Sequence, residues 1–409
     1  MDAPTSALVA ALRLSRARNV GPVTFRKLIR VFGSAEAALA APRDRLLEVP
    51  DISPRMAEGV AGARDDPWAF DEFERARQRG VKILTLDDPQ YPRALLSTYD
   101  PPPILYVDGS LLPEDALSVA IVGSRHCSHY GREQAERLAI GLARAGFTVV
   151  SGLARGIDTC AHQGALSVQR GRTIAVLGNG IGTVYPPENK GLYERITHNG
   201  GEGGAILSEL PLDTQPHASH FPGRNRIIAG MTLGTVVVEG TETSGSLITA
   251  RYAVDMNREV FAVPGSVSSP NSRGPHNLIK KGAKLVDDVE DILEELREIA
   301  EPMVRIRQPD ARIRVGSKTA NKVASSSEAP LFEPHSEPDT RPAGSDLRAL
   351  NLNPREQKLF NLLDLNTPRS VDDLIVNSGL QAHEVLATLL VLEVKRLCRQ
   401  LPGKRFLKA

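Results

Sequence analysis

Residues 148–158 read TVVSGLARGID, and this run decides the fold class. Its first part, Thr148–Ser151, has the nearly continuous apolar composition of a strand buried on both faces, and Gly152 and Gly156 follow it in a turn of small residues. The same order of strand and glycine turn recurs along residues 66–300. The expected strands are Val81–Leu86, Val119–Val122, Thr148–Ser151, Thr173–Leu177, Ala205–Leu207, Thr235–Val238 and Glu259–Val263. This alternation predicts an α/β fold with a doubly wound, mostly parallel, Rossmann-like sheet.

The glycine turns lie where doubly wound sheets bind their ligands, at the carboxyl ends of the strands. Glycine lets the backbone approach an anion, and small residues expose several backbone N–H groups that together bind phosphate. Each turn alone is weak evidence, but several at one sheet edge, carrying hydroxyls and arginines, predict a phosphate-lined pocket. Its expected residues are Gly123, Ser124, Arg125, Ser151, Gly152, Ala154, Arg155, Gly156, Ser244, Gly245 and Ser246.

A second run, FPGRNRIIAG at residues 221–230, is predicted to join this pocket. Arg224 and Arg226 flank Asn225, and Phe221 precedes them. Arginine offers a planar fork of donors that fits phosphate oxygens, and an aromatic face stacks on a base. The apolar residues that follow are expected to fix one side of the segment in a core, so that the polar groups are held in place.

Other known phosphate sites and catalytic constellations do not fit this sequence. Residues 178–182 (GNGIG) come closest to a dinucleotide fingerprint but lack the acidic residue expected on a following strand, and a P-loop motif is absent. We interpret Asp158 and His162, four residues apart, as a structural hydrogen bond. Glu209 and Glu239 are expected to bond to backbone or arginine. We therefore expect no catalytic residues, no metal and no cofactor.

The composition sets further limits. The net charge of the 409 residues is +1, so any binding to nucleic acid must come from local basic patches. The longest apolar stretch falls short of the roughly 20 residues of a membrane span, and the start of the chain lacks the layout of a signal peptide. Three widely separated cysteines argue against a disulfide framework and favour a reducing cytoplasm.

The flanks of the sheet domain differ from it. Residues 1–65 are expected to form short-looped helices, like a helix-hairpin-helix or SAM-like module, in which Asp51 would repel a phosphate. We favour a protein-interaction or structural role over DNA binding there. Residues 301–351 have the composition of a disordered linker. Residues 352–409 have the outline of a winged helix, and its third helix, 382–394, lacks the Arg, Asn and Gln side chains that read bases.

Together these motifs resemble the DprA/Smf family, the DNA-processing protein A family. The resemblance covers roughly residues 80–295 with high specificity, and the two flanking modules fit it less specifically. It is carried by residues 151–162 (SGLARGIDTCAH), 221–230, 244–250 (SGSLITA), Pro264-Gly265, Asn277 with Ile279, and Gly282-Ala283, with Tyr91-Pro92, residues 101–106, Tyr185-Pro186 and Asn189 in support.

The resemblance implies an extended Rossmann domain that binds single-stranded DNA without sequence preference and forms a homodimer. It also implies that the protein loads the RecA recombinase onto incoming strands during natural transformation and protects those strands from nucleases. The DNA pocket that it implies comprises Gly123, Ser124, Arg125, the Ser151–Gly156 turn, Phe221, Arg224, Asn225, Arg226 and the Ser244–Ser246 turn. Alanine at either Arg224 or Arg226 is then expected to weaken DNA binding without unfolding the protein.

The chain departs from the family pattern at two places. Gly182-Thr183 stands where the family usually has an acidic residue. Residues 215–220 (QPHASH) are less basic than expected beside a DNA groove, so that the affinity for phosphate there depends partly on histidine charge.

Two other functions stay open. One rival is a nucleotide phosphoribohydrolase, although the chain has only Gly234-Thr235 and Glu239 of the motif that such enzymes require. The other is a scaffold whose central domain binds no DNA.

Overall fold

The computed structural model describes residues 4–307, 354–364, 369–380, 397–401 and 405–408, and the single positions 385, 388, 389 and 392. Residues 1–316 form one compact unit and residues 317–409 form a second. The helical residues expected at 1–65 thus belong to the same unit as the sheet. The last helix of this unit continues to Arg307, and the rest of the expected linker lies outside the described residues. The bounds of the four segments read from the sequence stay predictions.

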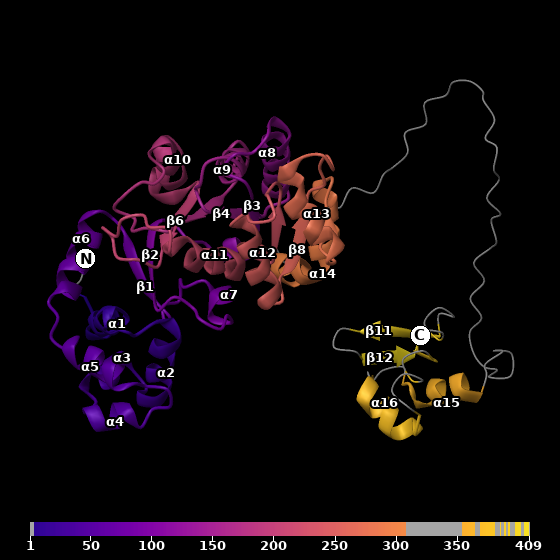
Figure 1. The fold of residues 1–409 in the computed structure, drawn as a ribbon, viewed down its shortest axis with the longest axis horizontal. Coiled ribbons are helices and arrows are strands. Elements are labelled where there is room, and N and C mark those ends of the chain that lie inside the picture. The colour runs from indigo at the N-terminus through magenta and orange to yellow at the C-terminus, as the bar shows by residue number, and fades with distance from the viewer. Residues whose placement is uncertain are drawn as a thin grey trace. The chain divides into compact units, whose positions relative to one another are not determined.

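A nine-stranded sheet organises the first unit (Figure 1), in the order β1-β2-β6-β5-β4-β3-β7-β8-β9. The strands from β6 to β9 pair in parallel, while β2 pairs antiparallel with β6 and β1 antiparallel with β2. The strands are β1 (Lys82–Thr85), β2 (Ile104–Gly109), β3 (Ser118–Val122), β4 (Thr148–Ser151), β5 (Thr173–Val176), β6 (Gly204–Ser208), β7 (Gly234–Val237), β8 (Glu259–Ala262) and β9 (Lys284–Leu285). The predicted doubly wound, mostly parallel sheet is confirmed. Strands β2 and β9 had not been expected.

Helices cover both faces of the sheet because alternate residues of each buried strand point to opposite sides. Val119 and Ile121 of β3 pack with α8 and α9, whereas Ala120 and Val122 pack with α11 and α12. Figure 1 shows these two pairs of helices on opposite sides of the strands. The helices of this part are α7 (Arg93–Leu96), α8 (His129–Arg144), α9 (Ile157–Leu166), α10 (Lys190–Gly201), α11 (His220–Met231), α12 (Ser246–Asp255), α13 (Arg273–Lys280) and α14 (Val289–Arg307), with short 3₁₀ turns η1 (Pro113–Ala116), η2 (Pro187–Asn189) and η3 (Pro270–Ser272).

Six helices precede the sheet and pack against its β2 end. They are α1 (Ser6–Arg16), α2 (Pro22–Phe32), α3 (Ala35–Ala40), α4 (Arg43–Leu47), α5 (Pro54–Gly62) and α6 (Trp68–Gln78). The fully buried carboxylate of Glu72 on α6 accepts a hydrogen bond from the Leu212 N–H at 2.7 Å. Arg75, one turn later, pairs with Asp213 at 2.5 Å. These bonds join the helices to the loop after β6, which explains why the two parts form one unit.

The second unit has its own core and a small sheet in the order β10-β12-β11. Its elements are α15 (Pro354–Leu362), β10 (Arg369–Ser370), α16 (Val371–Ser378), β11 (Cys398–Leu401) and β12 (Arg405–Lys408). The expected third helix, residues 382–394, lies mostly outside the described residues. The helices and the antiparallel strands agree with the winged-helix prediction.

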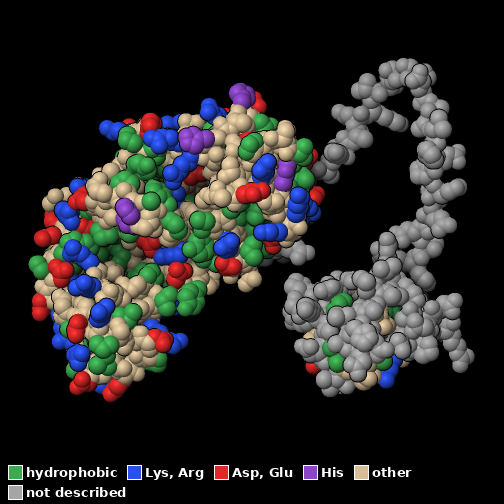
Figure 2. Space-filling model, viewed as in Figure 1, with side chains coloured by type: hydrophobic (Ala, Val, Ile, Leu, Met, Phe, Trp, Pro, Cys, Tyr) green, Lys and Arg blue, Asp and Glu red, His purple; other side chains and the backbone are tan. Residues whose placement is uncertain are grey.

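The surface of the first unit matches its near-neutral composition. Figure 2 shows basic and acidic side chains interspersed over the visible face of this unit. Among the described residues, no helix is long and apolar enough to cross a membrane.

Candidate nucleic-acid interface

A cavity of about 400 Å³ opens at the carboxyl edge of the sheet, between the turns that follow β3 and β7. Strands β4, β3 and β7 are consecutive neighbours in the sheet, so their turns meet here although they are far apart in sequence. The cavity is lined by Val122, Gly123, Ser124, Arg125, Ala154, Asp158, Phe221, Arg224, Asn225, Ile228, Thr241, Ser244, Gly245, Ser246 and Thr249. The structure thus brings together most of the residues expected from the sequence.

The glycines of the β3 and β4 turns are required by close packing. A Cβ on Gly123 would lie 2.6 Å from the Ile157 side chain, so only glycine leaves room for the first turn of α9. Gly156 has φ +79°, a backbone conformation that side chains other than glycine rarely adopt, and a Cβ there would collide with the Ser124 carbonyl oxygen. The two turns therefore fix each other's position, and the Ile157 N–H donates to the Ser124 oxygen at 3.3 Å.

The backbone donors of the β4 turn are used internally, which changes the sequence-based interpretation. Asp158 accepts hydrogen bonds from the N–H groups of Gly152 at 3.1 Å and Ala154 at 3.4 Å. The buried Ser151 hydroxyl donates to the Ile121 carbonyl at 2.6 Å. These groups hold the turn in shape. The amides of Gly152 and Ala154 are therefore not free to bind an anion, which the sequence had predicted for this turn.

The start of α12 lies beside the cavity, and its first N–H groups bond locally. The Ser246 N–H donates to the Ser244 hydroxyl at 3.4 Å, and the N–H groups of Leu247 and Ile248 donate to the carbonyl oxygens of Ser244 and Gly245, both at 3.1 Å. The N-cap of the helix is Gly245, which has no side chain to bond these N–H groups. The Ser244 and Ser246 hydroxyls lie 2.8 Å apart beside it and also line the cavity. The N-terminus of a helix carries a partial positive charge and attracts anions. This end of the cavity is therefore the best placed to receive a phosphate group.

Arg224 lines the cavity, but its guanidinium is directed into the protein. The residue is 5 % exposed, and Nη1 donates to the carbonyl oxygens of Gly152, at 2.7 Å, and Val176. Burial lowers the pKa of Arg224 to about 10, so the group stays charged at neutral pH. Its charge opposes the burial that raises the pKa of the neighbouring Asp158. Arg224 thus bridges the ends of β4 and β5, a structural role that the sequence did not indicate.

Arg226 does not reach the cavity. It forms ion pairs with Asp100, at 3.1 Å, and with Glu209. Because residues two apart on a helix point in nearly opposite directions, Arg224 and Arg226 of α11 cannot serve one site. The expectation that Glu209 and Glu239 bond to arginine or backbone is confirmed, since Glu239 accepts from the Ser128 N–H at 2.8 Å.

Arg125 is the cation that the cavity presents to solvent. It is exposed and forms no ion pair with any residue in the range 4–307, and its guanidinium lies 5.1 Å from the centre of the Phe221 ring. The edge of that ring packs directly on the backbone of Gly178. Asn225 donates to the Gly245 carbonyl at 3.3 Å and so links α11 to the start of α12. Arg155 is also exposed, but Glu188 pairs with it at 2.7 Å.

Asp158 and His162 do not bond to each other, although both have the structural role that we expected. His162 is fully buried and accepts from the Leu153 N–H at 3.3 Å, while its Nδ1 lies 2.7 Å from the Thr173 hydroxyl. Burial, and then the charge of Arg224, lowers the pKa of His162 to about 3, so the imidazole is neutral. Both side chains stabilise the β4 turn by accepting hydrogen bonds from its backbone N–H groups.

Some residues at this edge were not expected from the sequence. Thr241 and Thr249 line the cavity beside the serines, and Tyr185 lies 6.2 Å from Phe221, measured between ring centres. The Tyr185-Pro186 pair had been noted only as part of the family resemblance. Within the part of the chain that the structure describes, no three His, Cys, Asp or Glu side chains gather into a metal site.

Comparison with protein families finds three matches along the chain. Residues 82–297 match the family model described as DNA recombination-mediator protein A. Residues 6–46 match the DprA-like N-terminal HHH domain, and residues 339–404 match the DprA winged helix domain. These three matches agree with the helical, sheet and winged-helix parts of the fold.

Similar proteins share much of the chain's length. Protein Smf of Synechocystis sp. is 35% identical over 406 residues, which cover 97% of this chain and 97% of the relative. The DNA processing protein DprA of Bacillus subtilis is 43% identical over 220 residues, 54% of this chain and 72% of the relative. Among solved structures, DprA of Streptococcus pneumoniae superposes with a TM-score of 0.63 at 34% identity, covering 71% of this chain and 99% of that one.

Proposed function

The chain belongs to the DprA/Smf family of DNA recombination-mediator proteins, and on this premise we propose that it binds single-stranded DNA without sequence preference. The observation that carries the proposal is the cavity at the carboxyl edge of the sheet, which the exposed Arg125, the Phe221 ring and the N-terminus of α12 line together. Backbone amides and arginine bind phosphate whatever the base, and an aromatic ring accepts the face of any base. Such a site distinguishes single-stranded from double-stranded DNA but does not distinguish one base sequence from another.

In the proposed complex, a phosphate lies at the N-terminus of α12, beside the Ser244 and Ser246 hydroxyls and near Arg125. A base stacks at Phe221, a contact worth about 1–3 kcal/mol by typical truncation data. Because few charges take part, we expect salt to weaken binding moderately, with a slope of about 0.7 per phosphate neutralised. Single-stranded DNA fits this arrangement because a stacking contact requires an unpaired base.

The biological role that we propose follows from the family. A recombination mediator delivers single strands to a recombinase, and the relatives named DNA processing protein support such a role. We propose that the chain loads RecA onto incoming strands during natural transformation and protects those strands from nucleases, acting in the cytoplasm as a binding protein without catalytic activity. The burial of Arg224, Asp158 and His162 in structural bonds is consistent with a site that binds and does not cleave.

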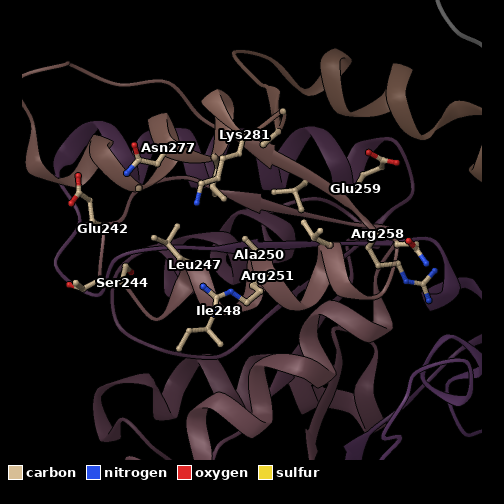
Figure 3. Close-up of a pocket in the computed structure, with 18 residues that line it drawn as sticks. Glu242, Ser244, Leu247, Ile248, Ala250, Arg251, Arg258, Glu259, Asn277 and Lys281 are labelled. Carbon is tan, nitrogen blue, oxygen red and sulfur yellow. The ribbon is translucent and has the colours of Figure 1, made fainter. Parts of the chain in front are cut away.

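We also propose a homodimer through the sheet domain. A groove of about 820 Å³ lies between α12 and α13 (Figure 3), next to the candidate site, with Leu247, Ile248 and Ala250 along its floor. Glu242 and Glu259 lie at opposite ends of it, and Arg251 and Lys281 lie between them.

The charges and the edge strand favour a second copy as the partner at this groove. A surface that carries both signs of charge suits a twofold interface, in which one patch meets itself. The neighbouring β9 is the edge strand of the sheet, and its Leu285 is 44% exposed. Two pockets in one dimer would bind one strand bivalently and with higher avidity.

The test of DNA binding is fluorescence anisotropy of the full chain with labelled oligo-dT, compared with a duplex of equal length, over a salt series. We expect a preference for the single strand and a loss of about tenfold in affinity for Arg125→Ala. An equal affinity for both DNA forms, or an unchanged affinity in Arg125→Ala, would contradict the proposed site. RecA loading is then measured as the rate of RecA-catalysed ATP hydrolysis on single strands coated with single-strand-binding protein, with and without this chain.

A further inference from the structure

The candidate site continues beyond Phe221 to the end of β5. A second, shallow region, with a cavity volume of only about 10 Å³, shares Arg125, Ala154 and Phe221 with the main cavity. Beyond Phe221 it is lined by Gly152, Arg155, Leu177, Gly178, Asn179, Tyr185 and Pro186. Strands β4 and β5 are neighbours in the sheet, so this region lies one strand further along the same carboxyl edge. A polynucleotide bound at Phe221 therefore has a continuous surface on which its next nucleotide can lie.

Tyr185 supplies an aromatic ring at this second position. Its ring is half-buried, and its plane is tilted by 44° to that of Phe221. The segment that carries it is held from both ends: Asn189 donates to the Leu153 carbonyl at 2.8 Å, and Asn179 donates to the Thr183 carbonyl at 2.6 Å. The ring position is therefore fixed before DNA arrives, which lowers the entropy cost of stacking.

Arg155 lies beside Tyr185 but is paired with an acid. Its Nη2 and Nε donate to Glu188 at 2.7 and 3.2 Å, and the Tyr185 side chain contacts the same guanidinium. The hydrogen bonds from Arg155 lower the pKa of Glu188, which is thus ionised at neutral pH. Both partners are about half-exposed, so solvent and a competing anion reach the pair. A phosphate at this position must displace Glu188 from Arg155.

We propose a second nucleotide subsite at this place, in which Tyr185 stacks on the base next to the one at Phe221, Arg155 binds the adjoining phosphate, and Glu188 competes with that phosphate. The inference rests on the proposed single-strand DNA binding and deepens it. Glu188 then limits the affinity of each bound nucleotide, because its carboxylate must leave the guanidinium and remain near a phosphate of like charge.

The first test is Glu188→Gln in the full chain, measured by anisotropy with oligo-dT over a salt series. Exposed ion pairs are weak, so we expect release of Arg155 to tighten binding by about two- to fivefold at low salt. The salt slope should steepen by about 0.7, the value for one further phosphate on a single strand. The matched control is Glu194→Gln, which removes an acid of similar exposure from the Lys190–Glu194 pair on α10.

A double-mutant cycle separates competition for Arg155 from a general change of charge. The Arg155→Ala substitution should weaken binding, and adding Glu188→Gln to it should bring no gain beyond that of Glu194→Gln. Tyr185→Ala should weaken binding by about fivefold or more, since a stacked base contributes about that much, whereas Tyr185→Phe should not. Tyr99→Ala, at a ring that is 78% exposed on the surface, serves as the aromatic control.

The outcomes distinguish the subsite from the function on which it rests. Suppose that the unmodified chain binds oligo-dT and that Arg125→Ala weakens this binding. If Glu188→Gln then has the same affinity as Glu194→Gln, and Tyr185→Ala the same affinity as Tyr99→Ala, the second subsite is wrong and the proposed function stands. If the unmodified chain fails to bind oligo-dT, both fail. The circular dichroism melting of each variant shows whether it has folded.

Discussion

Replacing Arg224 and Arg125 by alanine separates a structural arginine from a binding one. The Arg224 guanidinium is buried beside Asp158 and donates to the carbonyl oxygens of Gly152 and Val176. Its removal leaves a buried carboxylate without its countercharge and two buried acceptors with fewer donors. Breaking a buried charge pair in this way typically costs about 3–5 kcal/mol. We expect Arg224→Ala to lower the free energy of unfolding by an amount in this range.

Arg125 provides the contrast because it is exposed and its guanidinium lies over the face of Phe221. Such a cation–π contact contributes about 0.5–1 kcal/mol at an exposed site. Arg125→Ala should therefore change stability by no more than this amount while DNA affinity falls about tenfold. Stability is measured by urea unfolding followed by far-UV circular dichroism, and affinity by anisotropy with oligo-dT.

The decisive comparison is the stability of Arg224→Ala. If its urea midpoint equals that of the unmodified chain while its DNA affinity falls as much as that of Arg125→Ala, Arg224 is a phosphate ligand, as the sequence alone suggested. The structural reasoning would then be refuted. Arg224→Met, which keeps much of the side-chain volume, should be as unstable as Arg224→Ala if the lost charge and hydrogen bonds are responsible.

Three further predictions concern the pH dependence of stability, the glycine turns and the dimer. The pKa of His162 is lowered to about 3 from 6.5, so as pH falls the unfolded chain binds a proton there before the folded chain does. The free energy of unfolding should therefore fall by about 1.4 kcal/mol per pH unit below pH 6.5. In thermal melts between pH 7 and 5, the melting temperature of His162→Gln should depend less steeply on pH. Gly245→Ala should leave the melting temperature unchanged, since a Cβ there meets open space, but it should weaken oligo-dT binding by up to about tenfold. Gly156→Ala, at φ +79°, should lower the melting temperature. Leu285→Asp should raise the dimer dissociation constant at least tenfold by light scattering, and Val31→Asp, which changes a residue of similar exposure on α2, should not; equal dimerisation of the two variants would remove the proposed interface.

The sequence by itself determined the sheet and the edge at which its ligand site lies. Runs such as Val119–Val122 and Thr148–Ser151 became buried parallel strands, because both faces of a covered parallel strand must be apolar. The glycines after several of the strands marked the carboxyl edge, since only glycine tolerates the packing found at Gly123 and Gly156. These signals are local in the chain, so they can be read without knowing the fold. Strand β9 was missed because two exposed residues carry no such signal.

Only the tertiary structure decided which polar groups are free to bind. Arg224, Asn225 and Arg226 look equivalent in sequence, yet helix α11 turns Arg224 and Arg226 to opposite sides, one onto buried carbonyl oxygens and the other onto Glu209 and Asp100. The amides of Gly152 and Ala154 are occupied by Asp158, and those of Ser246 and Leu247 by Ser244. The Arg125 guanidinium, by contrast, is exposed and lies over the Phe221 ring. The availability of a donor depends on partners far away in the chain, and their positions follow only from how the helices pack on the sheet.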